Sequence, residues 1–275
     1  MDIQELERRI RLPEEAGRVA ERMQINAAEY EEQKRLFDED LNVFIENWKK
    51  REDKYEWALK FYLMLACDTH KIYNEKGIAE DIFDRSFYDI TIWCEECYRK
   101  YRRYGLEEVW WIAQSVKMNL YRLGRLQFEP YSLNKDIKTS AGILKQGTHV
   151  LNVHIPAGES LDYEKCLESF RMAETFFKNN QDKNLYLCDS WLLSPRLKEV
   201  LEDESNILKF QNMFEIVSVY ESYPQAEQRV FLDVKEDKSQ YPEDTSLRKR
   251  LKRYLLDGKN PGIGIGVIEN IYKYI

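Results

Sequence analysis

Residues 149–161 read HVLNVHIPAGESL, and this stretch decides the fold of the second half of the chain. Its first seven residues are rich in β-branched side chains and stop at Pro156, a pattern typical of a strand that ends at a proline. Residues 157–160 are small or polar and predict a turn, and Ser160 is placed to cap the helix that follows. The segment therefore predicts a strand, a loop and the start of a helix.

Further strands and helices are expected on both sides of this segment. Apolar side chains at helical spacing predict that the helix continues to residue 177. Runs rich in β-branched and aromatic residues predict strands at residues 126–131, 185–188, 214–220 and 229–234. Residues 262–266 read GIGIG and predict a strand with one bare face, against which another backbone packs closely. This order of elements predicts a mixed sheet covered by helices.

The residues up to Gly124 follow a different pattern. An apolar stripe begins at Leu6, and helical spacing of apolar residues continues over residues 30–48, 57–73, 80–104 and 106–123. Glycines follow the last three of these stretches, as expected where helices end. The fold class is therefore predicted to be α+β, with a helical N-terminal domain over residues 1–124 and a mixed β-sheet domain flanked by helices over residues 125–275.

Composition limits the partners of the protein. The net charge of -7 repels phosphate backbones, so no nucleic acid is expected as a partner. No apolar run approaches the ~20 residues that span a bilayer, so no membrane partner is expected either. The N-terminus is charged from Asp2 onward and the number of cysteines is odd, which favours a reducing, cytoplasmic setting.

Four residues in the helical half have spacings that invite a metal interpretation. Cys94 and Cys97 form one pair, and Cys67 and His70 form a second pair at the same spacing. If the two helices form a hairpin around Gly77, the two pairs lie at different heights along it. At a helical rise of 1.5 Å per residue, the offset between them is ~10 Å. We therefore expect buried structural thiols and no metal site.

The second half resembles a known family. Residues 150–161 are similar to the central strand, phosphate loop and helix of a GNAT-like C-terminal domain. Residues 188–195 (CDSWLLSP) resemble that family's next strand and helix start, and residues 206–214 (NILKFQNMF) resemble the stretch before the following strand. The helical half is similar to the N-terminal domain that accompanies it in bacterial N-acyltransferase proteins. The resemblance implies acyl transfer from acyl-CoA or acetyl-CoA to a small-molecule or peptide amine.

The resemblance also implies a coenzyme site at the end of the first strand and in the loop after it. The residues concerned are Ile155, Ala157, Gly158, Glu159, Ser160 and Leu161. Their peptide N–H groups, together with the positive end of the helix dipole, would face the pyrophosphate. A plain strand-to-helix turn fits the same residues, because Glu159, Asp162 and Glu164 bring negative charge to the helix start.

Two residues are expected to carry the chemistry. His154 and Asn152 share one face of the strand, and a histidine can take the proton from an amine nucleophile. Asp189 is expected to orient His154 or to bind the amine. The alternatives are a hydrogen-bonded histidine that anchors the strand end and an aspartate that caps a turn. The predicted function is an acyl-CoA-dependent N-acyltransferase, and the alternative is a non-catalytic GNAT-like binding or scaffold protein.

Overall fold

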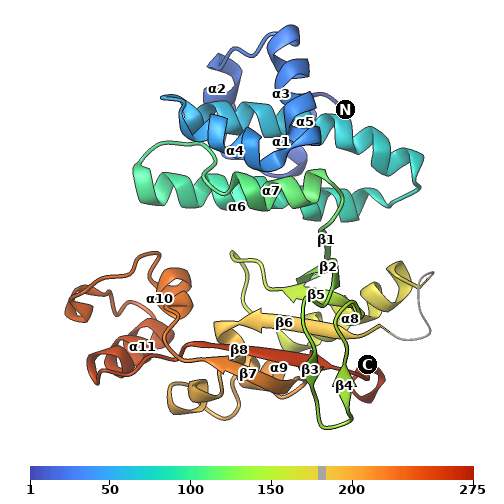
Figure 1. Cartoon of the computed structure of the whole chain (residues 1–275). Helices are drawn as coiled ribbons and strands as arrows, with labels where there is room; N and C mark the ends of the chain where they lie inside the picture. Colours follow the sequence, from blue (N-terminus) through green and yellow to red (C-terminus); the bar gives the residue numbers. More distant parts are fainter. Residues whose placement is uncertain (179–183) are drawn as a thin grey trace. The chain divides into compact units, whose positions relative to one another are not determined.

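The computed structural model describes residues 1–178 and 184–275. The chain divides into two compact units, Met1–Arg122 and Leu123–Ile275 (Figure 1). Among the residues that the structure describes, none of the helices combines the length and the apolar character needed to cross a bilayer.

The first unit is helical, as its sequence predicts. Its helices are α1 (Ile3–Arg9), α2 (Glu14–Arg22), α3 (Ala27–Glu39), α4 (Leu41–Lys49), α5 (Lys54–Glu75), α6 (Glu80–Tyr101) and α7 (Val109–Val116). Helix α5 packs against α1, α2, α4, α6 and α7, which explains why its sequence is apolar on more than one side. Its Phe61 ring stacks on Trp57, with centroids 4.7 Å apart, and on Phe44 of α4 at 5.3 Å.

The second unit is built on a mixed sheet, as predicted. The strand order is β1-β2-β5-β6-β8-β7, with β5 and β6 parallel and the pairs β2–β5, β6–β8 and β8–β7 antiparallel. The strands are β1 (Tyr121–Leu123), β2 (Leu126–Ser132), β5 (His149–His154), β6 (Tyr186–Ser190), β7 (Glu215–Tyr220) and β8 (Ile263–Ile268). Strands β3 (Ile137–Lys138) and β4 (Ile143–Leu144) form a separate hairpin.

The two faces of this sheet are covered by different elements. On one face, Phe170 of α8 (Tyr163–Phe176) lies edge-on to Phe128 and Tyr186, with ring centroids 5.7 and 4.9 Å apart. On the other face, Ile137 of the β3–β4 hairpin joins a buried cluster with Val150 of β5. The remaining elements are α9 (Asn206–Gln211), α10 (Gln225–Val230), α11 (Ser246–Leu256) and the 3-10 helices η1 (Trp191–Leu193), η2 (Pro195–Glu199), η3 (Lys238–Gln240) and η4 (Ile271–Lys273).

Two sequence predictions of secondary structure are wrong in part. The helix expected over residues 106–123 is only α7, because Met118 adopts a left-handed φ of 58° and the chain then enters β1. The strand expected over residues 229–234 does not form. Its first residues end α10, Leu232 has a φ of 61°, and Phe231 is buried by stacking on Tyr241 at 4.0 Å. Phe231 is buried and Val230 packs against the same cluster, whereas Val234 is exposed, so the β-rich composition of this run does not indicate strand pairing.

The GIGIG segment forms β8, as predicted, and its bare face has a reason. A Cβ atom placed on Gly264 would lie 2.2 Å from the carbonyl oxygen of Leu193. Another stretch of backbone therefore passes directly against this strand, and only glycine leaves room for it.

Candidate functional site

Strands β5 and β6 are paired over only part of their length. Their register contains Leu151 opposite Tyr186 and Asn152 opposite Leu187. Beyond that point β5 stays paired with β2 as far as His154, and β6 stays paired with β8 as far as Ser190. The two parallel strands therefore separate toward their carboxyl ends, and the sheet opens between them.

A polar cluster lies on one face of this opening. Asn152, His154 and Asp189 share that face, because Asn152 is in register with Leu187 and side chains two residues apart point the same way. Glu129 of β2 is in register with Asn152 and joins them. Its Oε2 lies 2.9 Å from His154 Nε2 and accepts a hydrogen bond from Asn152 Nδ2 at 3.0 Å.

The two carboxylates of the cluster have opposite electrostatic surroundings. Burial alone would raise the pKa of Glu129, but the hydrogen bond and charge of His154, with the Asn152 amide, lower that pKa below its ordinary value. Asp189 is exposed, yet desolvation by the surrounding protein raises its pKa, against the charges of His154 and Lys135. Glu129 is therefore the ionised partner of His154, and Asp189 is the carboxylate at the solvent side.

This electrostatic arrangement selects a tautomer for His154. An ionised carboxylate can only accept hydrogen bonds, so His154 Nε2 carries the proton that faces Glu129. In the neutral ring the lone pair then belongs to Nδ1. The His154 and Glu129 side chains are 24% and 22% exposed, so the ring is held in place while remaining accessible from solvent. Such a ring can accept a proton from a bound nucleophile.

Asn152 contributes an unsatisfied acceptor. Its Oδ1 is buried and has no hydrogen-bond partner within the described part of the chain, while its Nδ2 donates to Glu129. Reversing the amide would turn an oxygen toward the carboxylate, so the observed orientation is the favourable one. A buried acceptor without a protein partner suits an N–H or O–H donor supplied by a ligand.

The buried side chain of Arg125 binds the loop that follows β5. Its Nε donates to the carbonyl of Ser160 at 2.9 Å and its Nη2 donates to the carbonyl of Glu159 at 2.8 Å. With the carbonyls held, the N–H groups of the loop remain for other partners. For Ala157, Gly158, Ser160 and Leu161, no protein acceptor of these N–H groups occurs in the described residues.

The helix that follows the loop starts later than the sequence predicts. Helix α8 begins at Tyr163, and its N-cap is Asp162, whose Oδ1 accepts from the Lys165 N–H at 3.0 Å. The expectation that Ser160 caps this helix is therefore wrong, because the chain stays non-helical through residues 160–162 and Asp162 is the residue next to the first turn. Gly158 has a φ of 90°, which allows the sharp turn before it.

The six residues expected at the coenzyme site fall into two groups. The segment from Ala157 to Ser160 is exposed, and the N–H groups of Ala157, Gly158 and Ser160 are open to a ligand. The side chains of Ile155 and Leu161 instead pack against a buried cluster that includes Trp191. These two side chains anchor the ends of the loop, so any part they take in binding is through their peptide groups.

Sequence reasoning missed Glu129 and Arg125. Glu129 lies 25 residues before His154, and only the register of β2 against β5 brings the two together. Arg125 reaches the loop from the turn before β2, where nothing in the local sequence distinguishes it from an ordinary surface arginine. Both residues depend on strand pairing, which a single sequence does not specify.

The cysteines of the helical unit are buried or half-buried thiols. Burial raises the pKa of Cys94 and of Cys97 to about 12 and that of Cys67 to about 11. His70 lies 2.9 Å from Glu80 through its Nε2. No group of three or more His, Cys, Asp or Glu side chains able to hold a metal occurs in the parts of the chain that the structure describes.

Comparison with solved structures finds the same fold in acyltransferases. An acyltransferase in complex with decanoyl-CoA and teicoplanin is 19% identical, with a TM-score of 0.78 over 96% of this chain and 86% of that one. A complex with CoA and 10C-teicoplanin has a TM-score of 0.77 at 19% identity over the same shares of both chains. A complex with decanoyl-CoA covers 98% of this chain and 99% of that one, at 20% identity and a TM-score of 0.66.

A search of curated proteins finds no match. Two family models together match nearly the whole chain. Residues 1–118 match the N-acyltransferase N-terminal domain, and residues 120–268 match the GNAT-like C-terminal domain. The change of family model falls at residue 119, close to the division between the two compact units. The chain therefore belongs to the family of proteins in which an N-acyltransferase N-terminal domain precedes a GNAT-like C-terminal domain.

Proposed function

We propose that this protein is an acyl-CoA-dependent N-acyltransferase. The observation that carries the proposal is the separation of β5 from β6 beyond Asn152 and Leu187. A peptide-like arm such as pantetheine needs backbone and side-chain partners, and the opening supplies both. The related structures that hold acyl-CoA or CoA have the same fold, which supports acyl-CoA as the co-substrate.

The parts of acyl-CoA have matching groups in the protein. The N–H groups of Ala157, Gly158, Ser160 and Leu161 would receive the pyrophosphate, since exposed peptide donors favour an anion. The buried Asn152 Oδ1 would accept an amide N–H of the pantetheine arm. The thioester would then lie in the opening, on the face that carries His154 and Asp189.

The reaction follows from these positions. The amine nitrogen of the acceptor attacks the thioester carbonyl carbon, forming the amide bond, and the bond from that carbon to sulfur breaks. His154 takes the proton from the attacking nitrogen and returns it to the leaving sulfur, so that CoA departs as a thiol. Glu129 keeps the ring oriented. Asp189 attracts the acceptor as an ammonium ion, which releases one proton to solvent before the neutral amine attacks.

The acceptor in this proposal is a small molecule or peptide with an amino group. Two of the related structures contain teicoplanin or 10C-teicoplanin together with an acyl-CoA or CoA, which supports a small-molecule acceptor here.

We also infer a cytoplasmic location. The described cysteines are all free thiols, as in a reducing compartment.

Binding of the coenzyme is the first test. Decanoyl-CoA and acetyl-CoA should each raise the melting temperature, and a ligand present at a hundredfold excess over its Kd adds about 2.7 kcal/mol to stability. Absence of any shift at millimolar coenzyme, for short and long acyl chains alike, would overturn the proposal.

Turnover is the second test, with a panel of amines. His154→Gln keeps a hydrogen-bond donor for Glu129 but removes the base, so kcat should fall by ~10²–10⁴ while acyl-CoA still binds. His149→Gln, on the exposed start of the same strand, is the matched control and should keep full activity. Tight acyl-CoA binding without turnover of any amine would instead favour the non-catalytic binding protein.

A further inference from the structure

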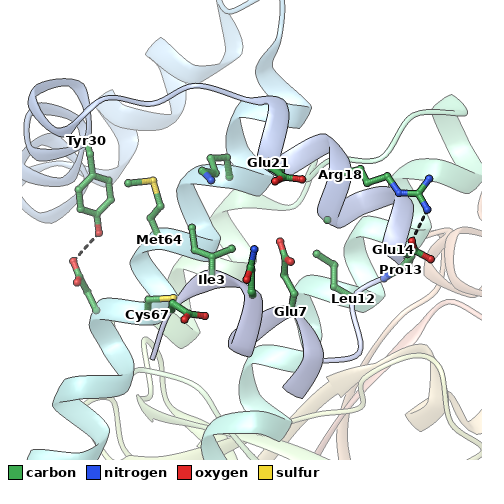
Figure 2. A pocket seen from close by; sticks show the side chains of 15 residues that line it. Ile3, Glu7, Leu12, Pro13, Glu14, Arg18, Glu21, Tyr30, Met64 and Cys67 are labelled. Atoms are coloured by element: carbon green, nitrogen blue, oxygen red, sulfur yellow. Dashed lines mark hydrogen bonds and ion pairs between the residues drawn. The ribbon is translucent and has the colours of Figure 1, made fainter.

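A cavity of about 740 Å³ lies within the first unit. Its walls come from α1, α2, α3 and α5 and from the link between α1 and α2 (Figure 2). This volume is within the range of small-molecule sites. All of its lining residues belong to residues 1–122, so the cavity is formed by one compact unit alone.

The cavity has an apolar part and an acidic part. Ile3, Leu12 and Met64 supply aliphatic and thioether surface. Glu7 of α1 and Glu21 of α2 extend their carboxylates into the same space, as Figure 2 shows. A ligand that fits both parts must be apolar along its length and positively charged at one end.

The carboxylates of the wall differ in their ionic partners. Besides Glu7 and Glu21 they are Asp2, Glu14 and Asp68. Two of these three have cations: Arg18 lies 2.5 Å from Glu14, and Lys34 lies 2.5 Å from Asp68.

Glu7 and Glu21 differ from those two carboxylates. Neither forms an ion pair with any residue that the structure describes. Burial raises the pKa of Glu7, Lys60 acts against that rise, and the charge of Glu21 adds to it. The Glu7 carboxylate thus has one cationic neighbour, Lys60, and one anionic neighbour, Glu21, so a further cation beside these two carboxylates would be favourable.

A glycine inside α2 preserves the space beside Glu7. Gly17 lies in the middle of the helix, where glycine costs up to about 1 kcal/mol relative to alanine. A Cβ atom at this position would lie 3.3 Å from Glu7 Oε2, closer than side chains normally approach. Helix α2 therefore accepts a weaker helix former at the point where the Glu7 carboxylate needs room.

We propose that this cavity is a second binding site, for an amphipathic primary amine. The ammonium group lies between the carboxylates of Glu7 and Glu21, and the hydrocarbon part contacts Ile3, Leu12 and Met64. This site is additional to the proposed acyl transfer and does not rest on it, because the second unit contributes none of its residues.

The test uses the full-length protein without any coenzyme, and two probes of matched shape. Hexylamine and 1-hexanol differ at neutral pH mainly in the charge of the head group. Calorimetric titration should show hexylamine binding at least about tenfold more tightly than 1-hexanol. Glu7→Gln and Glu21→Gln should each weaken hexylamine binding about tenfold and leave 1-hexanol binding unchanged. Glu15→Gln, exposed on α2 and outside the cavity, removes the same charge and should bind hexylamine as the original protein does.

Several outcomes would overturn the proposal. They are equal binding of the two probes, no hexylamine binding at concentrations on the order of 10 mM, or unchanged hexylamine affinity in both Glu7→Gln and Glu21→Gln. Glu21 is exposed, so its variant keeps the test valid even if Glu7→Gln fails to fold. His154→Gln should bind hexylamine normally, which separates this result from any failure of acyl transfer.

Discussion

The two edges of strand β6 differ in how much of their length is paired. We call the edge toward β8 the closed side and the edge toward β5 the open side. On one side, β6 is in register with β8 at every residue from Tyr186 to Ser190. On the other side, it is in register with β5 at only two residues, Tyr186 and Leu187. The closed side is apolar and close-packed, whereas the open side carries His154, Asn152 and Asp189.

The difference shows how one strand can serve stability and chemistry at once. On the closed side, glycines of β8 allow the backbone at Leu193 to pack directly on the sheet. On the open side, the β5–β6 pairing ends early, and polar side chains lie there, including Glu129 and Asp189 with shifted pKa values. Substitutions on the closed side should therefore change stability, and substitutions on the open side should change pH dependence and turnover.

The largest effect is expected on the closed side, from Gly264→Ala. The new Cβ would lie 2.2 Å from the Leu193 carbonyl oxygen, so the backbone must shift. We expect a loss of about 3 kcal/mol in the free energy of unfolding, measured by urea titration. Ile265→Val on the same strand is the control, and it should cost only about 0.5–1.5 kcal/mol. A Gly264→Ala protein as stable as the control would show that this side is not close-packed.

An intermediate effect is expected on the open side, from Glu129→Gln. The pKa of Glu129 is lowered in the folded protein, so its stabilising charge is fully present above the ordinary value of 4.5 and is lost as the pH falls through the folded-state pKa. The variant should be less stable by about 1 kcal/mol at pH 7 and equal to the original protein at low pH.

Thermal melts of the Glu129→Gln variant across this pH range, alongside Glu236→Gln as an exposed control, measure the difference. A difference that does not depend on pH would refute the ionised pair of Glu129 and His154. Because Glu129 acts through His154, the Glu129→Gln variant should shift the pH profile of kcat. KM for the amine should change less.

The smallest stability effect is expected from Asp189→Asn. Desolvation raises the pKa of this carboxylate, so its charged form destabilises the folded protein once the pH rises through the folded-state pKa. The variant should be equally stable or slightly more stable at pH 7, within about 0.5 kcal/mol, and the gain should vanish below pH 3.8. KM for the amine should rise at pH 7, and a lower KM would contradict a role for Asp189 in attracting the acceptor.

The elements themselves were predictable where local patterns are strong. Helical spacing gave the extents of α5 and α6 closely, and β-branched runs gave β5, β7 and β8. The prediction failed at residues 229–234, where Phe231 is buried without strand pairing and Leu232 turns the chain, and at residues 117–123, where Met118 turns the chain. In both places a tertiary contact or a single left-handed residue overrides the local preference.

The residues of the candidate site divide in the same way. The sequence alone indicated His154 and Asp189, since residue type and position at a strand end are local properties, and the family resemblance implied the loop after the strand. Their role in catalysis stays a prediction. Their partners Glu129 and Arg125, the orphan Asn152 Oδ1 and the parting of β5 from β6 appear only in the tertiary structure. Each depends on which strands pair and in which register, and register is set by long-range packing that no single segment encodes.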